Sequence, residues 1–179
     1  MCEEKNECKG AISIELWDAR TRDGELTGGT LVRGEPIPEG LYHLVCEVLV
    51  RHADGSFLAM KRDESKEMFP GWWETTAGGS ALAGESSLDC ARRELLEETG
   101  IACDSFVHIG RYIGAEYIFD SYLCVVDCPK DCVRFQEGET VGYRWMSEAE
   151  FGEFVCSERM IPWQKQRLTS YLQKAGYIE

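Results

Sequence analysis

Three glutamates in one short segment carry the clearest chemical signal of this chain: Glu94, Glu97 and Glu98. The apolar residues around them recur at helical spacing, which predicts a helix that begins near Ser87. Side chains three and four positions apart share one helix face, so the carboxylates are expected on one patch of surface. Their mutual repulsion is removed when they share a divalent cation, and oxygen ligands at this density suit Mg²⁺ or Mn²⁺.

The glutamates belong to a longer pattern of fixed spacing that runs from Gly79 to Ile101. It reads G-x5-E-x7-R-E-L-x-E-E-x-G-I, and the chain matches every position. With ordinary amino-acid frequencies, a chance match at one start point has odds on the order of 10⁻⁹. The pattern is the signature of the Nudix family, and on these residues the chain resembles Nudix hydrolases.

The resemblance implies roles for several residues of the pattern. In Nudix enzymes the arginine at the position of Arg93 braces the motif carboxylates, often the one that corresponds to Glu85. The backbone carbonyl before the first motif glycine is commonly a metal ligand, and here it belongs to Gly78. The implied ligands of Mg²⁺ or Mn²⁺ are Glu94, Glu97, Glu98 and Gly78. On an arbitrary helix, three such glutamates are better explained as a solvated acidic face, and the rest of the pattern reverses that preference here.

A further acidic stretch precedes a predicted strand at residues 141–146. In many Nudix proteins a glutamate in this loop reaches the metals or acts as the general base, and Glu139 occupies the matching place, with Glu137 as second choice. A polar loop with surplus charge is the alternative. The implied catalytic residues are Glu97, Glu98, Arg93 and Glu139.

Candidate substrate-binding residues lie before the motif. Lys61 and Arg62 end a predicted strand that leads toward the catalytic loop, so either could clamp a phosphate, although a surface role fits equally well. Trp73 could be a stacking platform for a base or part of the core. The candidates for substrate binding are Arg62, Lys61 and Trp73.

Periodicity, turn residues and caps predict strands around one central helix, with two helices at the end of the chain. The predicted strands are residues 12–17, 41–52, 57–62, 74–77, 106–113, 117–126 and 141–146. Gly78 and Gly79 are predicted to form a turn, and Ser86 and Gly100 to cap the central helix. The resemblance implies the Nudix α/β/α sandwich, an α/β fold with a mixed β-sheet and a loop-helix catalytic motif.

Length and composition favour a single domain at residues 11–179, which the resemblance implies is a Nudix domain, after an N-terminal leader at residues 1–10 that could be mobile. No apolar run is long enough to span a bilayer and no signal peptide is recognisable, which predicts a cytoplasmic protein without a membrane partner. The nine cysteines are expected to be reduced. A net charge of −13 argues against a nucleic-acid polymer, whereas a small diphosphate-containing substrate remains compatible through the metal. Homodimer formation is left open.

A less specific resemblance covers most of the chain and concerns the branch related to isopentenyl-diphosphate isomerase. It rests on residues 42–44, 61–62 and 69–73, and on Glu139 four positions before Tyr143. That isomerase needs a cysteine in the turn before its motif and a metal-binding histidine two residues later. This chain has Gly78 and Ser80 at those positions, so the isomerase machinery is incomplete.

The sequence therefore favours a hydrolase that cleaves a diphosphate linkage in a nucleoside diphosphate derivative or related small diphosphate, by water attack on phosphorus. The alternatives are an isopentenyl-diphosphate isomerase-like enzyme and a non-catalytic Nudix domain that senses a ligand. Such sensors often lose motif carboxylates, and this chain keeps them all. ADP-ribose is disfavoured, because relatives that cleave it often carry a proline about fifteen residues beyond the motif, where Glu116 stands here.

Overall fold

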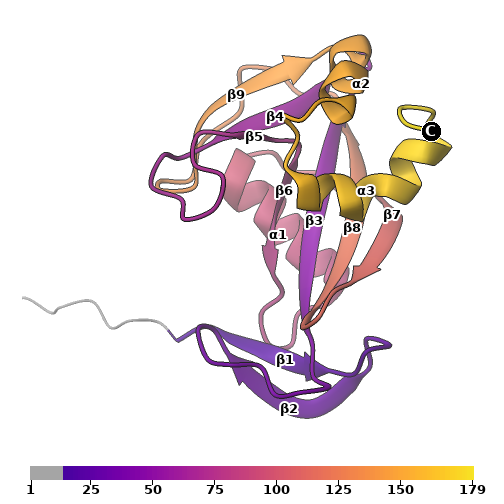
Figure 1. Cartoon of the computed structure of the whole chain (residues 1–179). Helices are drawn as coiled ribbons and strands as arrows, with labels where there is room; N and C mark the ends of the chain where they lie inside the picture. The colour runs from indigo at the N-terminus through magenta and orange to yellow at the C-terminus, as the bar shows by residue number, and fades with distance from the viewer. Residues whose placement is uncertain (1–13) are drawn as a thin grey trace, which may run out of the picture.

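The structure of the chain, a computed structural model, describes residues 14–179 (Figure 1). The predicted leader at residues 1–10 and the predicted start of the first strand at Ile12 lie outside the described residues. The strands are β1 Leu16–Arg20, β2 Leu26–Val32, β3 His43–His52, β4 Phe57–Arg62, β5 Trp73–Glu74, β6 Thr76–Ser80, β7 Phe106–Ile113, β8 Tyr117–Val126 and β9 Thr140–Met146. The helices are α1 Ser87–Thr99, α2 Glu148–Cys156 and α3 Pro162–Lys174.

Strand β3 organises a mixed, seven-stranded sheet. It pairs in parallel with β8, and antiparallel with β6 near its start and with β4 at its end. Strand β7 pairs with β8, while β5 and β9 pair with β4. This register sets Glu47 of β3 against Gly78 of β6 and against Ser121 of β8.

Alternate residues of β3 face different layers, because successive side chains of a strand point to opposite faces of the sheet. Val48 packs in a core with Leu95 of α1, whereas Leu49 packs in another core with Phe151 of α2 and Leu168 of α3. Figure 1 accordingly shows α1 on one side of the sheet and α2 and α3 on the other. The predicted α/β/α sandwich is confirmed.

Helix α1 is capped at the predicted residues. The Ser86 side chain accepts a hydrogen bond from the Asp89 backbone N–H at 3.2 Å, and Gly100 ends the helix at φ 70°. That φ lies in the left-handed region, which glycine adopts without steric cost. Because Ala91 and Leu95 are fully buried, the caps and the core together fix the direction of the acidic face.

The two glycines before α1 lie inside strand β6, and the predicted turn at this place is wrong. A Cβ on Gly78 would lie 2.1 Å from the backbone oxygen of Cys46 on β3, so no side chain fits between the strands. A Cβ on Gly79 would lie 2.5 Å from Oε1 of Glu94. The glycines are needed for close approach, which a sequence pattern does not distinguish from a turn.

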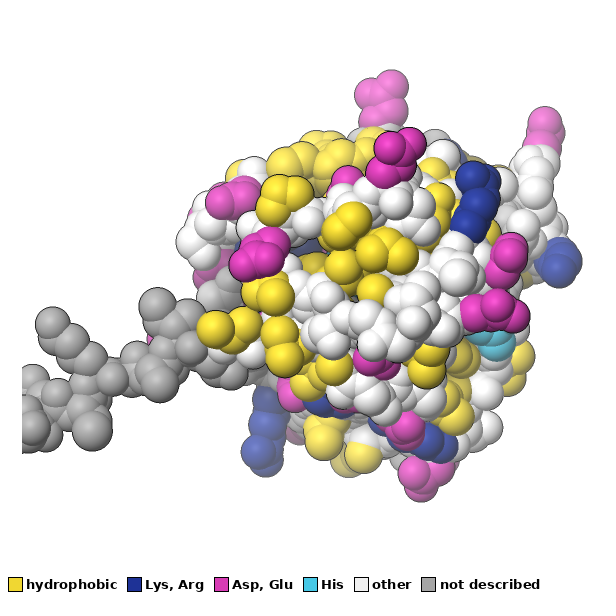
Figure 2. Space-filling model, turned by 90° about the horizontal axis from the view of Figure 1, so that it is seen from below, with side chains coloured by type: hydrophobic (Ala, Val, Ile, Leu, Met, Phe, Trp, Pro, Cys, Tyr) yellow, Lys and Arg dark blue, Asp and Glu magenta, His cyan; other side chains and the backbone are white. Residues whose placement is uncertain are grey.

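A separate two-stranded sheet, β1 with β2, lies beyond the start of β3 (Figure 1). Strand β1 begins at Leu16, later than predicted, and β2 was absent from the prediction because its sequence LTGGTLV contains two glycines. Glycine disfavours a strand until a partner strand fixes it. Trp17 and Leu31 bury a small core of their own, and hydrophobic side chains gather on the surface at this end of the molecule (Figure 2).

Candidate active site

Residues from α1, β3, β6 and α3, and from the loops before β5 and β9, line one cavity of about 470 Å³. Its seven glutamates are Glu15, Glu47, Glu74, Glu94, Glu97, Glu98 and Glu139, and its five basic residues are Arg33, Arg62, Lys66, Arg93 and Arg167. Because acidic residues outnumber basic ones, a phosphate substrate requires additional positive charge here. The four motif residues of α1 in this lining, Arg93, Glu94, Glu97 and Glu98, are called the α1 wall below.

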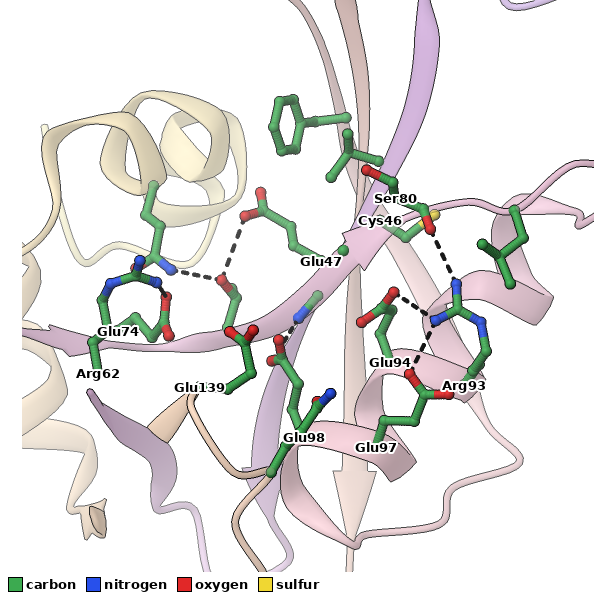
Figure 3. A pocket seen from close by; sticks show the side chains of 18 of the residues that line it. Cys46, Glu47, Arg62, Glu74, Ser80, Arg93, Glu94, Glu97, Glu98 and Glu139 are labelled. Atoms are coloured by element: carbon green, nitrogen blue, oxygen red, sulfur yellow. Dashed lines mark hydrogen bonds and ion pairs between the residues drawn. The ribbon is translucent and has the colours of Figure 1, made fainter. Parts of the chain in front are cut away.

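Arg93 connects the carboxylates of the α1 wall (Figure 3). Its guanidinium donates to Glu85 at 2.7 and 2.9 Å, to Glu94 at 2.7 Å and to Glu97 at 3.1 Å. It also donates to the backbone oxygen of Ser80 at 3.0 Å. The contact between Arg93 and Glu85 that the family resemblance implied is present. These hydrogen bonds hold the pKa of Glu85 below its ordinary value and raise the pKa of Arg93, so both groups stay ionised.

Glu98 has a different environment from its neighbours. It accepts a hydrogen bond from the Gly78 backbone N–H at 3.0 Å, and no basic side chain of residues 14–179 forms an ion pair with it. Burial, followed by the nearby charge of Glu74, raises the pKa of Glu98 well above its ordinary value. An uncompensated carboxylate of this kind is stabilised by a divalent cation.

The α1 wall fits a divalent cation by the chemistry of its donors. Its hard carboxylate oxygens, beside the backbone of β6, are the ligand types that Mg²⁺ and Mn²⁺ take in proteins. In the described part of the chain, no three His, Cys, Asp or Glu side chains yet converge as a ligand set. Glu94 and Glu97 point to Arg93, while Glu98 points to Gly78 (Figure 3). Each of Glu94 and Glu97 has one carboxylate oxygen that does not accept a hydrogen bond from Arg93, so both can coordinate a cation while Arg93 holds them.

Glu139 lines the pocket from the loop before β9, and its carboxylate forms an ion pair with Lys66. The backbone N–H of Asp63 donates to the Glu139 backbone oxygen at 2.9 Å, which ties this loop to the loop before β5. Glu137, the second choice from sequence, is exposed and outside the lining. Of the two glutamates, Glu139 is the one placed to act in the pocket.

Arg62 also lines the pocket, where two partners hold it. Its guanidinium donates to Glu74 at 2.9 Å and to the backbone oxygen of Met68 at 3.0 and 3.2 Å. Burial raises the pKa of Glu74, although Arg62 opposes the rise. Figure 3 shows Glu74 beside Glu139 in the pocket. The sequence offered no signal for Glu74, since one glutamate in a two-residue strand has no periodicity.

Lys61 and Trp73 do not line this cavity. Neighbouring residues of a strand point to opposite faces, so Lys61 diverges from Arg62, and its ammonium lies 3.9 Å from Glu64. The Trp73 ring packs beside the core formed with α2 and α3, where the Arg144 guanidinium lies 4.7 Å from the ring centroid. The structure thus brings only Arg62 of the three substrate-binding candidates into the pocket.

A second part of the lining, called the sheet wall below, consists of Glu47, Phe119, Gln164 and Arg167. Arg167 of α3 donates to Glu47 Oε2 at 2.7 and 3.0 Å, and its guanidinium lies 4.2 Å from the Phe119 ring centroid. Ser121 donates to the other Glu47 oxygen at 2.7 Å. Sequence reasoning missed this wall. A glutamate within the apolar run of β3 was the available signal, because a buried charge needs a partner.

Comparison with known proteins agrees with this geometry. A model of the NUDIX domain matches residues 41–168. This chain belongs to the Nudix family. An uncharacterized Nudix hydrolase of Listeria monocytogenes serovar 1/2a is 34% identical to this Nudix chain over 152 residues, which cover 84% of the chain and 90% of the relative.

Solved structures show the same Nudix fold. DR0079 from Deinococcus radiodurans aligns with a TM-score of 0.68 at 19% identity, covering 85% of this chain and 96% of that one. A MutT protein from Methanosarcina mazei Go1 aligns with a TM-score of 0.57 at 21% identity, covering 75% of this chain and 95% of that one. At such identities the likeness concerns the fold alone.

As a Nudix hydrolase, the chain is an enzyme that acts on phosphoanhydride bonds of small diphosphate substrates, and the family generally uses divalent metal ions. The comparisons do not confirm the isomerase-like branch. Within residues 14–179, no helix has the length and apolar character needed to cross a membrane. The cytoplasmic location and the homodimer stay predictions.

Proposed function

We propose that this Nudix hydrolase uses Mg²⁺ or Mn²⁺ to cleave the diphosphate linkage of a nucleoside diphosphate derivative or related small diphosphate, by water attack on phosphorus. One observation carries the proposal. Glu98, beside Gly78, has a raised pKa and no basic partner among the described residues. A cation shared by Glu98 and a diphosphate would neutralise both. The cavity of about 470 Å³ is in the size range of small-molecule sites.

Each residue of the pocket has its own role in the proposed reaction. The cation would be held by Glu94, Glu97, Glu98 and the backbone carbonyl of Gly78. When bound, the cation supplies charge neutralisation for the diphosphate and a more acidic water. Glu139 accepts the proton of the attacking water, and Arg93 orients the motif carboxylates. Arg62 donates to a phosphate oxygen through the N–H groups that its protein partners leave unused. The products are two monophosphates when both ends of the diphosphate are esterified, and a monophosphate and inorganic phosphate when one end is free.

The test is a phosphatase-coupled malachite-green assay over nucleotide sugars, coenzymes and other diphosphates whose two ends are both esterified, so that the phosphatase alone releases nothing. Each substrate is run with Mg²⁺, with Mn²⁺ and with EDTA. We expect metal-dependent release, greatest for a nucleoside diphosphate derivative other than ADP-ribose. No release from any member of the panel would contradict the proposal, and ADP-ribose as the best substrate would contradict the substrate preference.

The isomerase alternative meets a steric obstacle in the structure. A cysteine at position 78 would bring its Cβ to 2.1 Å from the Cys46 backbone oxygen, so the acid that protonates the alkene has no place there. Incubation with isopentenyl diphosphate and Mg²⁺ should give no dimethylallyl diphosphate. Isomerisation that Glu139→Gln abolishes and Glu98→Gln leaves intact would favour the isomerase. A sensor would bind a nucleotide and release no phosphate in the coupled assay.

A further inference from the structure

The carboxylate of Glu139, which the proposed reaction needs, is already paired with the ammonium of Lys66. Its ammonium forms an ion pair with Glu139, and both side chains line the pocket. The two side chains are 23% and 34% exposed, so the pair is partly shielded from water. Sequence reasoning pointed to Lys61 and Arg62 as phosphate ligands and did not select Lys66.

Three arginines of the pocket are less free to change partners than Lys66, whereas Arg33 is 67% exposed and paired with Glu15. Each of Arg62, Arg93 and Arg167 donates two or more hydrogen bonds to protein groups. The Lys66 ammonium has one recorded partner in the described part of the chain, the Glu139 carboxylate. An ammonium on a flexible four-carbon stem can exchange one anion for another with little loss of geometry.

Backbone contacts hold the two loops in place independently of this pair. The Lys66 backbone N–H donates to the Asp63 backbone oxygen at 3.2 Å, and the Asp63 N–H donates to the Glu139 backbone oxygen at 2.9 Å. The Lys66 side chain can therefore leave Glu139 without separating the loops. Glu74 lies in the same part of the lining and keeps the region acidic around Lys66.

We propose that Glu139 is a further carboxylate of the metal site, so that Lys66 and the metal ion compete for it, and that Lys66 moves to an oxygen of the substrate diphosphate once Glu139 is released. The inference rests on the proposed function and adds a substrate-binding residue to it. An ammonium and a divalent cation are attracted to the same carboxylate oxygens, so the Lys66 ion pair competes with metal binding at Glu139. Lys66 thus restrains Glu139 in the empty pocket and contributes positive charge to the occupied one.

This exchange predicts two effects of opposite sign in Lys66→Gln. Without substrate, Mn²⁺ should bind about two- to fivefold more tightly, because the competing ammonium is gone and partly exposed ion pairs are weak. With saturating Mg²⁺, imidodiphosphate should bind about tenfold more weakly, because a charge-assisted hydrogen bond to phosphate is lost. A residue that only supports the fold would shift both affinities in the same direction.

Both affinities are measured by isothermal titration calorimetry on the full chain, and circular dichroism checks that the variant is folded. Lys66→Arg keeps the charge and should retain most of the imidodiphosphate affinity. Lys130→Gln is the matched control, because Lys130 forms its ion pair with Asp54 and lies outside the lining. It should leave both affinities unchanged.

Opposite shifts in Lys66→Gln, absent in Lys130→Gln, support the exchange. Unchanged affinities, or shifts in one direction, overturn it. The hydrolase proposal is tested separately, because neither titration requires turnover. If the wild-type chain cleaves no diphosphate and the opposite shifts are nevertheless seen, the hydrolase proposal fails while the assignment of Lys66 holds.

Discussion

The α1 wall and the sheet wall of the pocket both combine glutamate with arginine, yet their charges are balanced differently. On the α1 wall, Glu98 has no basic partner among the described residues while Arg93 serves its neighbours. On the sheet wall, Arg167 is paired with a single carboxylate, that of Glu47, which is 3% exposed. Excess negative charge suits a wall that binds a cation, whereas a neutral buried pair suits one that fixes the shape of the cavity.

The largest effect on turnover is expected from a substitution in the α1 wall that leaves the sheet wall unchanged. In Glu98→Gln, kcat at saturating Mg²⁺ should fall by about 10²- to 10⁴-fold, because a ligand and the activation of water are lost together. The melting temperature without added metal should not fall, since an unpaired, half-buried charge has been removed. Steady-state kinetics and thermal unfolding check both statements, with exposed Glu153→Gln on α2 as the control. Near-native turnover would show that Glu98 is not a metal ligand.

Removing a charge from the sheet wall should lower the stability of the fold, in contrast to the substitution in the α1 wall. Arg167→Met leaves Glu47 buried without its partner, and removal of one member of a buried pair costs about 3–5 kcal/mol of unfolding free energy. The double variant Glu47→Gln/Arg167→Met should recover much of that loss, because no charge is then left unpaired. Urea unfolding of the wild type, Glu47→Gln, Arg167→Met and the double variant measures the coupling. If the double variant were no more stable than Arg167→Met, the pair would not be the source of the stability.

A moderate loss of activity is expected when Arg93 keeps its charge but loses its several hydrogen bonds. Arg93→Lys keeps one positive charge but cannot donate to Glu85, Glu94 and Glu97 together. Activity should fall by about 10- to 100-fold, the usual effect of losing a residue that orients metal ligands. Raising the Mg²⁺ concentration should restore part of it. If the lysine variant had wild-type kinetics, the charge of Arg93 would suffice and the multiple contacts would be dispensable.

The smallest effect is a pH dependence of the metal-free chain. Burial raises the folded-state pKa of Glu98, so its contribution to stability is present at low pH and is lost as the pH rises through that pKa. The wild-type side chain carries more of this charge at pH 7.5 than at pH 5, whereas the side chain in Glu98→Gln carries none at either pH. The gain in melting temperature from Glu98→Gln in EDTA should therefore be larger at pH 7.5. An equal gain at the two pH values would contradict the raised pKa.

Sequence predicted the α1 wall well because its determinants are local. The caps Ser86 and Gly100 and the three carboxylates lie within one helix and its ends, where spacing alone decides which side chains share a face. The sheet wall could not be predicted in this way. Glu47 and Arg167 are 120 positions apart and meet only through the packing of α3 on the sheet.

The same contrast between local and long-range contacts explains the other places where the structure differs from the prediction. Gly78 and Gly79 look like a turn until the distance between β6 and β3 is known, and Lys66 looks like a surface lysine until Glu139 is placed beside it. Strand β2 needs β1 as a partner before a segment with two glycines is held as a strand. In each case the missing information was a contact between segments distant in the chain.

The parallel pairing of β3 with β8 also has a consequence for folding. Ser121 and Glu47 face each other across 74 positions of sequence, and the whole Nudix motif lies in the chain between them. Helix α1 can form early from local contacts, but closing so long a loop carries an entropic penalty that slows folding. The pocket is complete only after this closure. The cavity that would receive the substrate therefore forms late in folding, because Phe119 of β8 is part of its lining, whereas the proposed metal ligands between Gly78 and Glu98 can come together before the sheet closes.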